Sequence, residues 1–309
     1  MLPMALEPSV PAIRVAPFAK GFNGRAKKVE DRIQDYLIDS NEENIHDVRT
    51  SIRRLDTSIR VLPKVIRRQP KVSDLRNYYR NFFKINSEIR DIDVIRSKFT
   101  QYPQDVTSSY PNFIETLQEH RDKKLKEAKE MALSAYNLEP LRIKKGDVSE
   151  KKLQRRYQKV ATEFTNEIES LFPRVISDIG RRTELHDLRK DCKKLRYTLE
   201  VADSSAKGKR NIQGVVGLLE DMQDVLGAIH DCDIMLLHLA RAKGGLHARR
   251  MNDVEDGKGD FSDLIDLEQK ERVKLYYQFV SRYGNGPAQQ SSGFSSKKQE
   301  IASNKAAVA

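Results

Sequence analysis

The segment HDVRTSIRRL at positions 46–55 returns as HDLRKDCKKL at positions 186–195. The shorter segment RDIDV at 90–94 returns as HDCDI at 230–234, with the same offset of 140 residues. Two segments that share one offset indicate a duplicated structural unit. The repeated unit contains a histidine followed by cations at helical spacing, so the repeat preserves candidate functional residues as well as core positions.

The composition and periodicity around these segments favour an all-α fold. Hydrophobic residues make up 38% of the 309 residues and charged residues 33%, which is typical of amphipathic helices with wide solvent-facing sides. We find no convincing alternation with a period of two and therefore expect no strands. The 140-residue offset maps the expected helices onto one another, so we predict two pseudo-symmetric helical bundles packed around a central basic cleft. The expected helices lie near 26–39, 42–68, 72–86, 87–100, 111–137, 148–180, 183–203, 208–229, 230–243 and 262–283.

Composition also sets the expected domain limits. Residues 1–24 contain prolines and glycines without helical periodicity, and predict a flexible N-terminal arm. Residues 25–283 are expected to form one domain of two helical halves, about 25–140 and 148–283. Residues 284–309, rich in Gln, Ser, Lys and Ala, predict a disordered C-terminal tail. Pro63 and Pro173 lie within helical patterns and predict kinks or breaks.

The net charge favours a polyanionic partner. Lys and Arg outnumber Asp and Glu by 56 to 45, a formal charge of +11, which suits nucleic acid, an acidic membrane surface or a phosphate polymer. Cys192 and Cys232 lie in apolar stripes and are expected to be reduced core residues. The first twenty residues lack the features of a secretion signal, and no run approaches the roughly 20 apolar residues of a membrane helix. We expect an intracellular, cytoplasmic protein without a cofactor.

Helical periodicity places the repeated cations on one side of each helix. At about 100° per residue, the cations that follow each histidine lie within about 80° of it, beside the apolar stripe. The first cationic ridge comprises His46, Arg49, Arg53 and Arg60, and the second comprises His186, Arg189, Lys193 and Arg196. Neighbouring cations on a helix repel one another, and we expect no carboxylates between them. The first ridge is about 21 Å long, which suits an extended polyanion.

Two further groups of residues stand beside the ridges. Arg76, Arg80 and Lys84 form an i, i+4, i+8 stripe that extends the site or faces solvent, and their offset partners are not cations. The aspartate pairs are Asp91 with Asp93 and Asp231 with Asp233. Residues i and i+2 do not share a helix face, so neither pair alone is expected to bind a metal ion through both carboxylates. One aspartate of each pair is expected either to orient a ridge cation or histidine by a charge-assisted hydrogen bond, or to begin its helix.

These motifs resemble a known family. The patterns His46-x-x-Arg49-x-x-x-Arg53 and His186-x-x-Arg189-x-x-x-Lys193 are similar to the two signature helices of CHAD domains, the conserved histidine α-helical domains. The 90–93 and 226–233 segments resemble the family's later motif, and the resemblance spans about residues 26–283. It implies two helical bundles around a basic cavity that binds inorganic polyphosphate, without catalytic activity. No Glu-x-Glu-x-Lys motif of the triphosphate-tunnel type occurs, so we expect a stand-alone binding module, in the cytoplasm or on polyphosphate granules.

The resemblance also implies the contact residues. The first half would contribute His46, Arg49, Arg53, Arg54 and Arg60, and the second half His186, Arg189, Lys190, Lys193, Lys194 and Arg196. The first copy departs from the family pattern at Asp56, where the family usually has a cation, so the binding surface is expected to be asymmetric there. The sequence identifies no protein partner.

Two other function classes remain open at this stage. The three His-Asp dipeptides, which begin at His46, His186 and His230, suit a metal-dependent phosphohydrolase, although the nearby cations would repel a metal. The +11 charge also permits nucleic-acid binding. Proteins that bind single-stranded nucleic acid usually stack its bases on aromatic rings, and this chain has no Trp and only 7% aromatic residues. Polyphosphate is therefore the preferred ligand.

Overall fold

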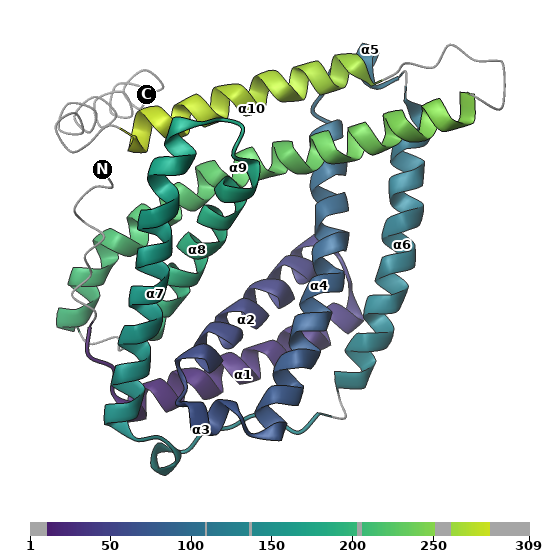
Figure 1. The fold of residues 1–309 in the computed structure, drawn as a ribbon. Helices are drawn as coiled ribbons and strands as arrows, with labels where there is room; N and C mark the ends of the chain where they lie inside the picture. The colour runs from purple at the N-terminus through teal and green to yellow at the C-terminus, as the bar shows by residue number, and fades with distance from the viewer. Residues whose placement is uncertain (1–10, 109, 136–137, 203–205, 251–260, 285–309) are drawn as a thin grey trace, which may run out of the picture.

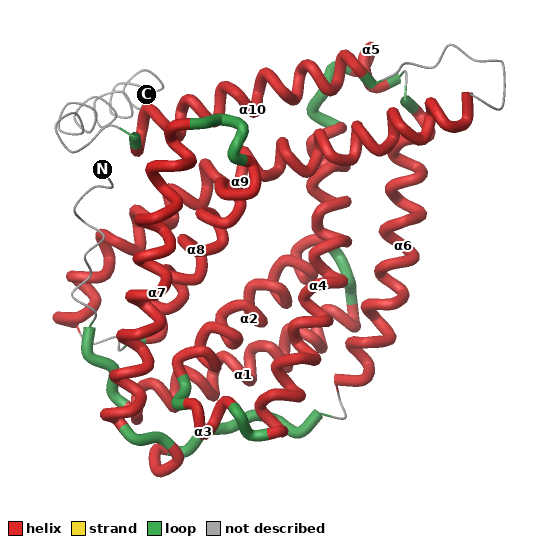
Figure 2. The backbone as a smooth tube through the Cα atoms, in the orientation of Figure 1, coloured by secondary structure: helices red, strands yellow, loops and turns green. Residues whose placement is uncertain are grey.

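The computed structural model describes residues 11–108, 110–135, 138–202, 206–250 and 261–284, and within these ranges it contains helices and loops but no strand (Figure 2). The all-α class is thus confirmed. In chain order the elements are α1 (Val15–Ile38), α2 (Glu42–Val61), α3 (Lys64–Arg67), α4 (Pro70–Phe99), α5 (Gln104–Thr107), α6 (Pro111–Ser134), the 3-10 turn η3 (Lys145–Asp147), α7 (Glu150–Ser177), α8 (Arg182–Val201), α9 (Ala206–Arg250) and α10 (Ser262–Tyr283).

The long helices form two bundles with the same order of contacts. In the first half α1 packs on α2 and α4 on α6, and in the second half α7 packs on α8 and α9 on α10. The bundles meet where α2 contacts α8 and where α4 contacts α9. Figure 1 shows these four helices bordering the middle of the molecule. The architecture agrees with the two expected bundles, while the duplication inferred as its origin stays a prediction.

Local sequence explains several helix ends. The Asn41 side chain caps α2 by accepting a hydrogen bond of 2.8 Å from the Asn44 backbone N–H. Pro63 separates α2 from α3, which confirms the break predicted there. Pro70 and Pro111 begin α4 and α6, where a proline has no hydrogen bond to lose. By contrast, α7 continues through Pro173.

Some expected boundaries are wrong. The flexible arm was expected to reach residue 24, but α1 begins at Val15 and buries Phe18 and Phe22. The helices expected at 72–86 and 87–100 are one helix, α4, because no Gly or Pro interrupts it. Those expected at 208–229 and 230–243 are likewise one helix, α9. Residues 1–10 of the expected arm and 285–309 of the expected tail lie outside the described residues.

Three apolar cores hold the bundles. One fills most of the first half, a second fills the second half, and Cys192 and Cys232 are free and buried as expected. The third core combines residues of α4 and α6 with residues of α9 and α10, so it belongs to both halves. Within it Phe261 adopts a left-handed backbone conformation, with φ of 62°. Its ring stacks on Tyr110 of the first half, with ring centroids 4.2 Å apart, which helps to hold this strained residue.

Candidate functional site

The two cationic ridges come together where α2 contacts α8. Arg49 and Arg53 of α2 lie close enough to Arg189 and Lys193 of α8 to affect their ionisation: the charge of Arg189 lowers the pKa of Arg49, and those of Arg49 and Arg53 lower the pKa of Lys193. We call these four residues the quartet. Among the described residues, no carboxylate oxygen lies within 4.0 Å of a quartet nitrogen. The quartet therefore joins both halves in one cationic surface that has no direct ion-pair partner in the described parts of the chain.

Burial makes the charge of the quartet costly. Burial, followed by the charges of Arg53 and other nearby groups, lowers the pKa of Arg49 to about 10. Burial and then the charge of Arg189 lower the pKa of Lys193 to about 7, and burial is also the main cause of the lowered pKa values of Arg53 and Arg189. The buried Nε atoms of all three quartet arginines have no hydrogen-bond partner. A bound anion would supply the opposite charge, and its oxygens could accept hydrogen bonds from the guanidinium and ammonium groups.

Aromatic rings support the ridge arginines. The guanidinium groups of Arg49 and Arg53 lie 5.3 Å and 5.6 Å from the centroid of the Phe83 ring on α4, and Arg49 Nη2 is 3.4 Å from the Ser87 hydroxyl. Tyr197 similarly supports Arg196, at 4.9 Å, and Arg54, at 5.6 Å. Cation–π contacts orient a guanidinium without neutralising it. Phe83 was not among the predicted site residues, because it lies on the neighbouring helix and outside every repeated motif.

Most other predicted cations are paired with acids. Arg54 lies 3.7 Å from Glu200, Lys190 2.6 Å from Asp187, Lys194 2.6 Å from Asp191, and Arg196 2.5 Å from Glu220. Arg60, Arg76 and Arg80 all surround Asp56, at 3.0, 2.5 and 3.6 Å. The expectation that no acid accompanies the ridges is therefore wrong at Arg60 and Arg196. Lys84 is exposed, farther along α4.

The signature histidines lie beside the quartet. His46 Nε2 is 3.4 Å from the Thr50 hydroxyl, which also accepts a hydrogen bond from Arg53. His186 Nδ1 lies 3.2 Å from Nδ1 of His230, a residue that sequence analysis did not place in the site. Burial and then nearby cations lower the pKa of His46 and of His186, and the same causes lower that of His230 to about 3. All three are therefore neutral at pH 7, and each can donate one hydrogen bond but adds no charge.

The structure divides each aspartate pair between two roles. Asp93 is fully buried and accepts a 2.6 Å hydrogen bond from Arg121 of α6, and Asp233 accepts one of 2.6 Å from Arg272 of α10. These arginines are not ridge residues, so Asp93 and Asp233 do not orient a ridge cation or histidine. Both aspartate pairs lie well inside α4 and α9, so the alternative that one aspartate of each pair begins its helix is wrong.

The other aspartate of each pair faces the quartet. Burial raises the pKa of Asp91 to about 6, the charge of Arg49 opposes the rise, and Asp231 adds to it. Burial also raises the pKa of Asp231, opposed by the charge of Arg189. Neither forms the expected direct hydrogen bond to a ridge residue among the described parts. They act on the quartet through charge alone.

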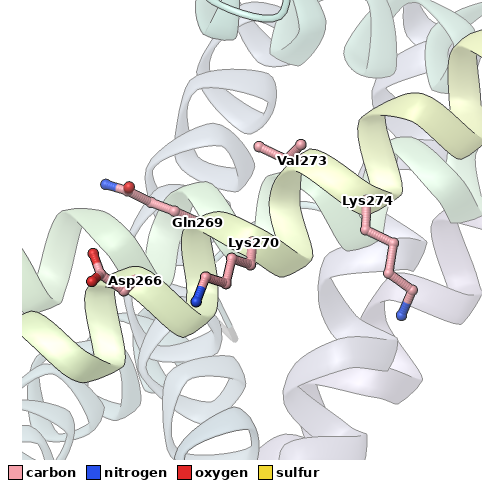
Figure 3. A pocket seen from close by; sticks show the side chains of 5 residues that line it. All are labelled: Asp266, Gln269, Lys270, Val273 and Lys274. Atoms are coloured by element: carbon pink, nitrogen blue, oxygen red, sulfur yellow. The ribbon is translucent and has the colours of Figure 1, made fainter.

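Other kinds of site gain no support from the described residues. No three His, Cys, Asp or Glu side chains come together there in a way that could hold a metal ion. Figure 3 shows a hollow along α10, lined by Asp266, Gln269, Lys270, Val273 and Lys274, that includes no predicted site residue. No helix in the described part of the chain has the length and apolarity to cross a membrane.

Comparison with known proteins agrees with the ridge motifs. The family model described as CHAD domain matches residues 22–240. A crystal structure of the CHAD domain from the plant Ricinus communis superposes with a TM-score of 0.54 and 16% sequence identity, covering 94% of this chain and 93% of that one. At this identity the structural match shows the fold alone. No curated protein matches the chain at a significant level. The quartet and the signature histidines lie within the residues that the family model matches, which are more than half of the chain. The chain belongs to the CHAD domain family.

Proposed function

We propose that this chain binds inorganic polyphosphate, without turning it over, on the surface centred on the quartet. The carrying observation is that four half-buried cations from two helices converge without a carboxylate partner among the described residues. Such an arrangement costs stability unless an anion neutralises it. The family resemblance of the ridge motifs supports the same ligand. The cytoplasmic location expected from the sequence belongs to this proposal.

Binding would be electrostatic and cumulative. Each quartet arginine can donate two hydrogen bonds to phosphate oxygens, and Lys193 contributes a point charge. His46 and His186, neutral at pH 7, would each donate one hydrogen bond at the edge of the surface. By analogy with nucleic acids, affinity should fall steeply with salt and rise with the number of phosphates in contact. No step in this account needs a nucleophile or a metal ion.

The aromatic residues at the surface argue against single-stranded nucleic acid. Base stacking requires an open ring face. Arg49 and Arg53 lie over Phe83, and Tyr197 is only 5% exposed and contacts Arg54 and Arg196. These rings position cations and leave no platform for a base. A phosphate polymer, which has no bases to stack, suits the surface better.

Calorimetric titration tests the proposal. The parent should bind long-chain polyphosphate more tightly than tripolyphosphate or single-stranded DNA at equal phosphate concentration. Charge reversal of the quartet, as R49E/R53E/R189E/K193E, should abolish binding while circular dichroism shows unchanged helical content. A control with the same change in net charge reverses four exposed lysines of α6 and α10, as K123E/K126E/K129E/K270E. Equal binding by the quartet variant and this control would refute the proposal, and displacement of polyphosphate by DNA would favour nucleic acid.

A further inference from the structure

α2 and α4 lie side by side in opposite directions and are joined by a row of polar and cation–π contacts. Contacts join Glu42 to Arg90, Arg49 to Ser87, Arg53 to Phe83 and Asp56 to Arg76. Residue numbers rise along α2 as they fall along α4, so the pairs follow one another along the interface. The quartet arginines lie in the middle of this row, and the arginines around Asp56 lie toward the C-terminal end of α2.

The C-terminal end of α2 carries an excess of arginine. Arg60, Arg76 and Arg80 share the carboxylate of Asp56. Although burial alone would raise it, the pKa of Asp56 is lowered, chiefly by the hydrogen bond and charge of Arg76. Asp56 is therefore ionised at neutral pH, yet it compensates one charge of three.

Two more arginines join this group from α3 and α7. Arg67 Nε donates to the Leu62 carbonyl at 2.8 Å, and Arg156 Nε donates to the Arg60 carbonyl at 3.0 Å. Burial and then the charges of Arg156 and Arg76 lower the pKa of Arg67, so these guanidinium groups share one neighbourhood. Glu163 lies 3.9 Å from Arg156. We call Arg60, Arg67, Arg76, Arg80 and Arg156 the arginine end; its five cations face two carboxylates.

At the corresponding end of the second half the carboxylates are matched by arginines, since Glu200 lies 3.7 Å from Arg54 as well as near Arg196. Arg196 lies at the position equivalent to Asp56 in the repeated segments, and it contacts Glu220 at 2.5 Å and Glu200 at 3.8 Å. Glu220 occupies the repeat position of Arg80. A phosphate chain that continued along α8 and α9 would meet arginines already paired with these two carboxylates, whereas one that continued along α2 and α4 would meet an excess of arginine over carboxylate.

We infer that a long polyphosphate chain bound at the quartet continues along the α2–α4 row onto the arginine end, so that this end confers preference for long polymers. The inference rests on the proposed function. Arg53 and Arg60 are seven residues apart on one helix, about 10 Å along its axis. A short chain held at the quartet leaves the arginine end unoccupied, while a long chain gains its contacts. Arg67 and Arg156, which no sequence motif marks, thereby become ligand contacts.

The test compares polymer lengths in one variant. R67Q/R80Q/R156Q removes three charges from the arginine end and leaves the quartet intact. We expect its affinity for long-chain polyphosphate to fall by about 10- to 100-fold at low salt, with a shallower salt dependence. Its affinity for tripolyphosphate should stay within about twofold of the parent, since each lost contact is charge-assisted and local.

Two controls separate charge from structure. R67K/R80K/R156K keeps the charges and should retain most of the long-chain affinity. K123Q/K126Q/K129Q on α6 loses the same net charge from exposed lysines and should bind both polymers as the parent does. Thermal melts of all variants report on folding.

The outcomes distinguish the two proposals. If R67Q/R80Q/R156Q loses affinity equally for both polymers, or loses none for the long chain, the proposed role of the arginine end is refuted, although binding of polyphosphate by the parent still supports the proposed function. If the parent binds neither polymer, the proposed function itself fails.

Discussion

The quartet and the two buried arginines Arg121 and Arg272 both bring cations into the interior, but the groups that face these cations differ. Arg121 and Arg272 each donate to a carboxylate at 2.6 Å, from Asp93 and Asp233. The quartet has no such partner among the described residues. At these two structural arginines the chain supplies an acid with good geometry; at the quartet it does not. The distribution of carboxylates, more than that of cations, marks the surface left for a ligand.

The largest effect should come from breaking a structural pair. Arg121→Met leaves the fully buried Asp93 without its cation, so we expect the free energy of unfolding to fall by about 3–5 kcal/mol. Chemical denaturation measures it. Replacing both partners, as D93L/R121M, should cost less than Arg121→Met because no buried charge is left unpaired. If Arg121→Met were as stable as the parent, Arg121 would not stabilise the fold and would not differ in this respect from the quartet arginines.

Neutralising quartet arginines should have the opposite pattern. In R53Q/R189Q the free energy of unfolding should stay level or rise, because mutual repulsion is relieved. Affinity for long-chain polyphosphate should fall by about 100-fold, or about 2.7 kcal/mol, for the loss of two charge-assisted contacts. Titration and denaturation of the same preparation give both quantities. Loss of stability without loss of binding would show that these arginines serve the fold.

The pH dependence of the free energy of unfolding shows how much the buried charge of Lys193 destabilises the fold. Its folded pKa of about 7 lies below the unfolded value of about 10.4, so the folded state binds fewer protons between these values. Its contribution therefore favours the folded state at high pH and is lost as pH falls toward 7. Lys193→Met should raise the free energy of unfolding at pH 7 by about 1.5 kcal/mol, within the usual range for such relief. Urea denaturation should show this gain at pH 7 and little of it at pH 10.

The same residue predicts how binding responds to pH. Polyphosphate favours the charged form of Lys193, so affinity should rise as pH falls from 8 to 6, by about fivefold or about 1 kcal/mol. Protonation of Asp91, whose pKa is raised to about 6 chiefly by burial, adds to the rise at the acid end. Lys193→Arg keeps the charge throughout and should flatten the profile above pH 7. An equally steep profile in that variant would assign the effect to another group.

The cationic ridges could be predicted from the sequence because helical periodicity depends only on residues of the same helix. Arg49, Arg53, Arg189 and Lys193 follow from rotation by about 100° per residue within one helix. Some acidic partners lie on the same helix, three or four residues from the cation, and this spacing could have indicated the pairs Arg60–Asp56, Lys190–Asp187 and Lys194–Asp191. Other partners come from other helices. Glu220 and Phe83 could not be assigned to Arg196 and Arg53 without knowing which helices pack together. Arg76 was expected to extend the site or to face solvent, and its pairing with Asp56 could not be predicted without the antiparallel register of α2 and α4.

The wrong prediction for the start of the first helix also comes from contacts with other helices. Prolines and glycines before residue 25 suggested a flexible arm, yet Phe18 and Phe22 bury enough surface in the first core to continue α1 through them. The unbroken α4 matters more for function, because one helix carries Arg76, Phe83, Asp91 and Asp93. Their relative positions are therefore fixed by one rigid element.

The third core, with Phe261 stacked on Tyr110, means that the two halves share buried aromatic surface. Cutting the chain between its bundles would expose that surface on both fragments, so neither half should survive as an independent folding unit. The protein should melt in a single cooperative transition. Its two charged helices would then already be assembled before any ligand arrives, and association would incur little reorganisation entropy.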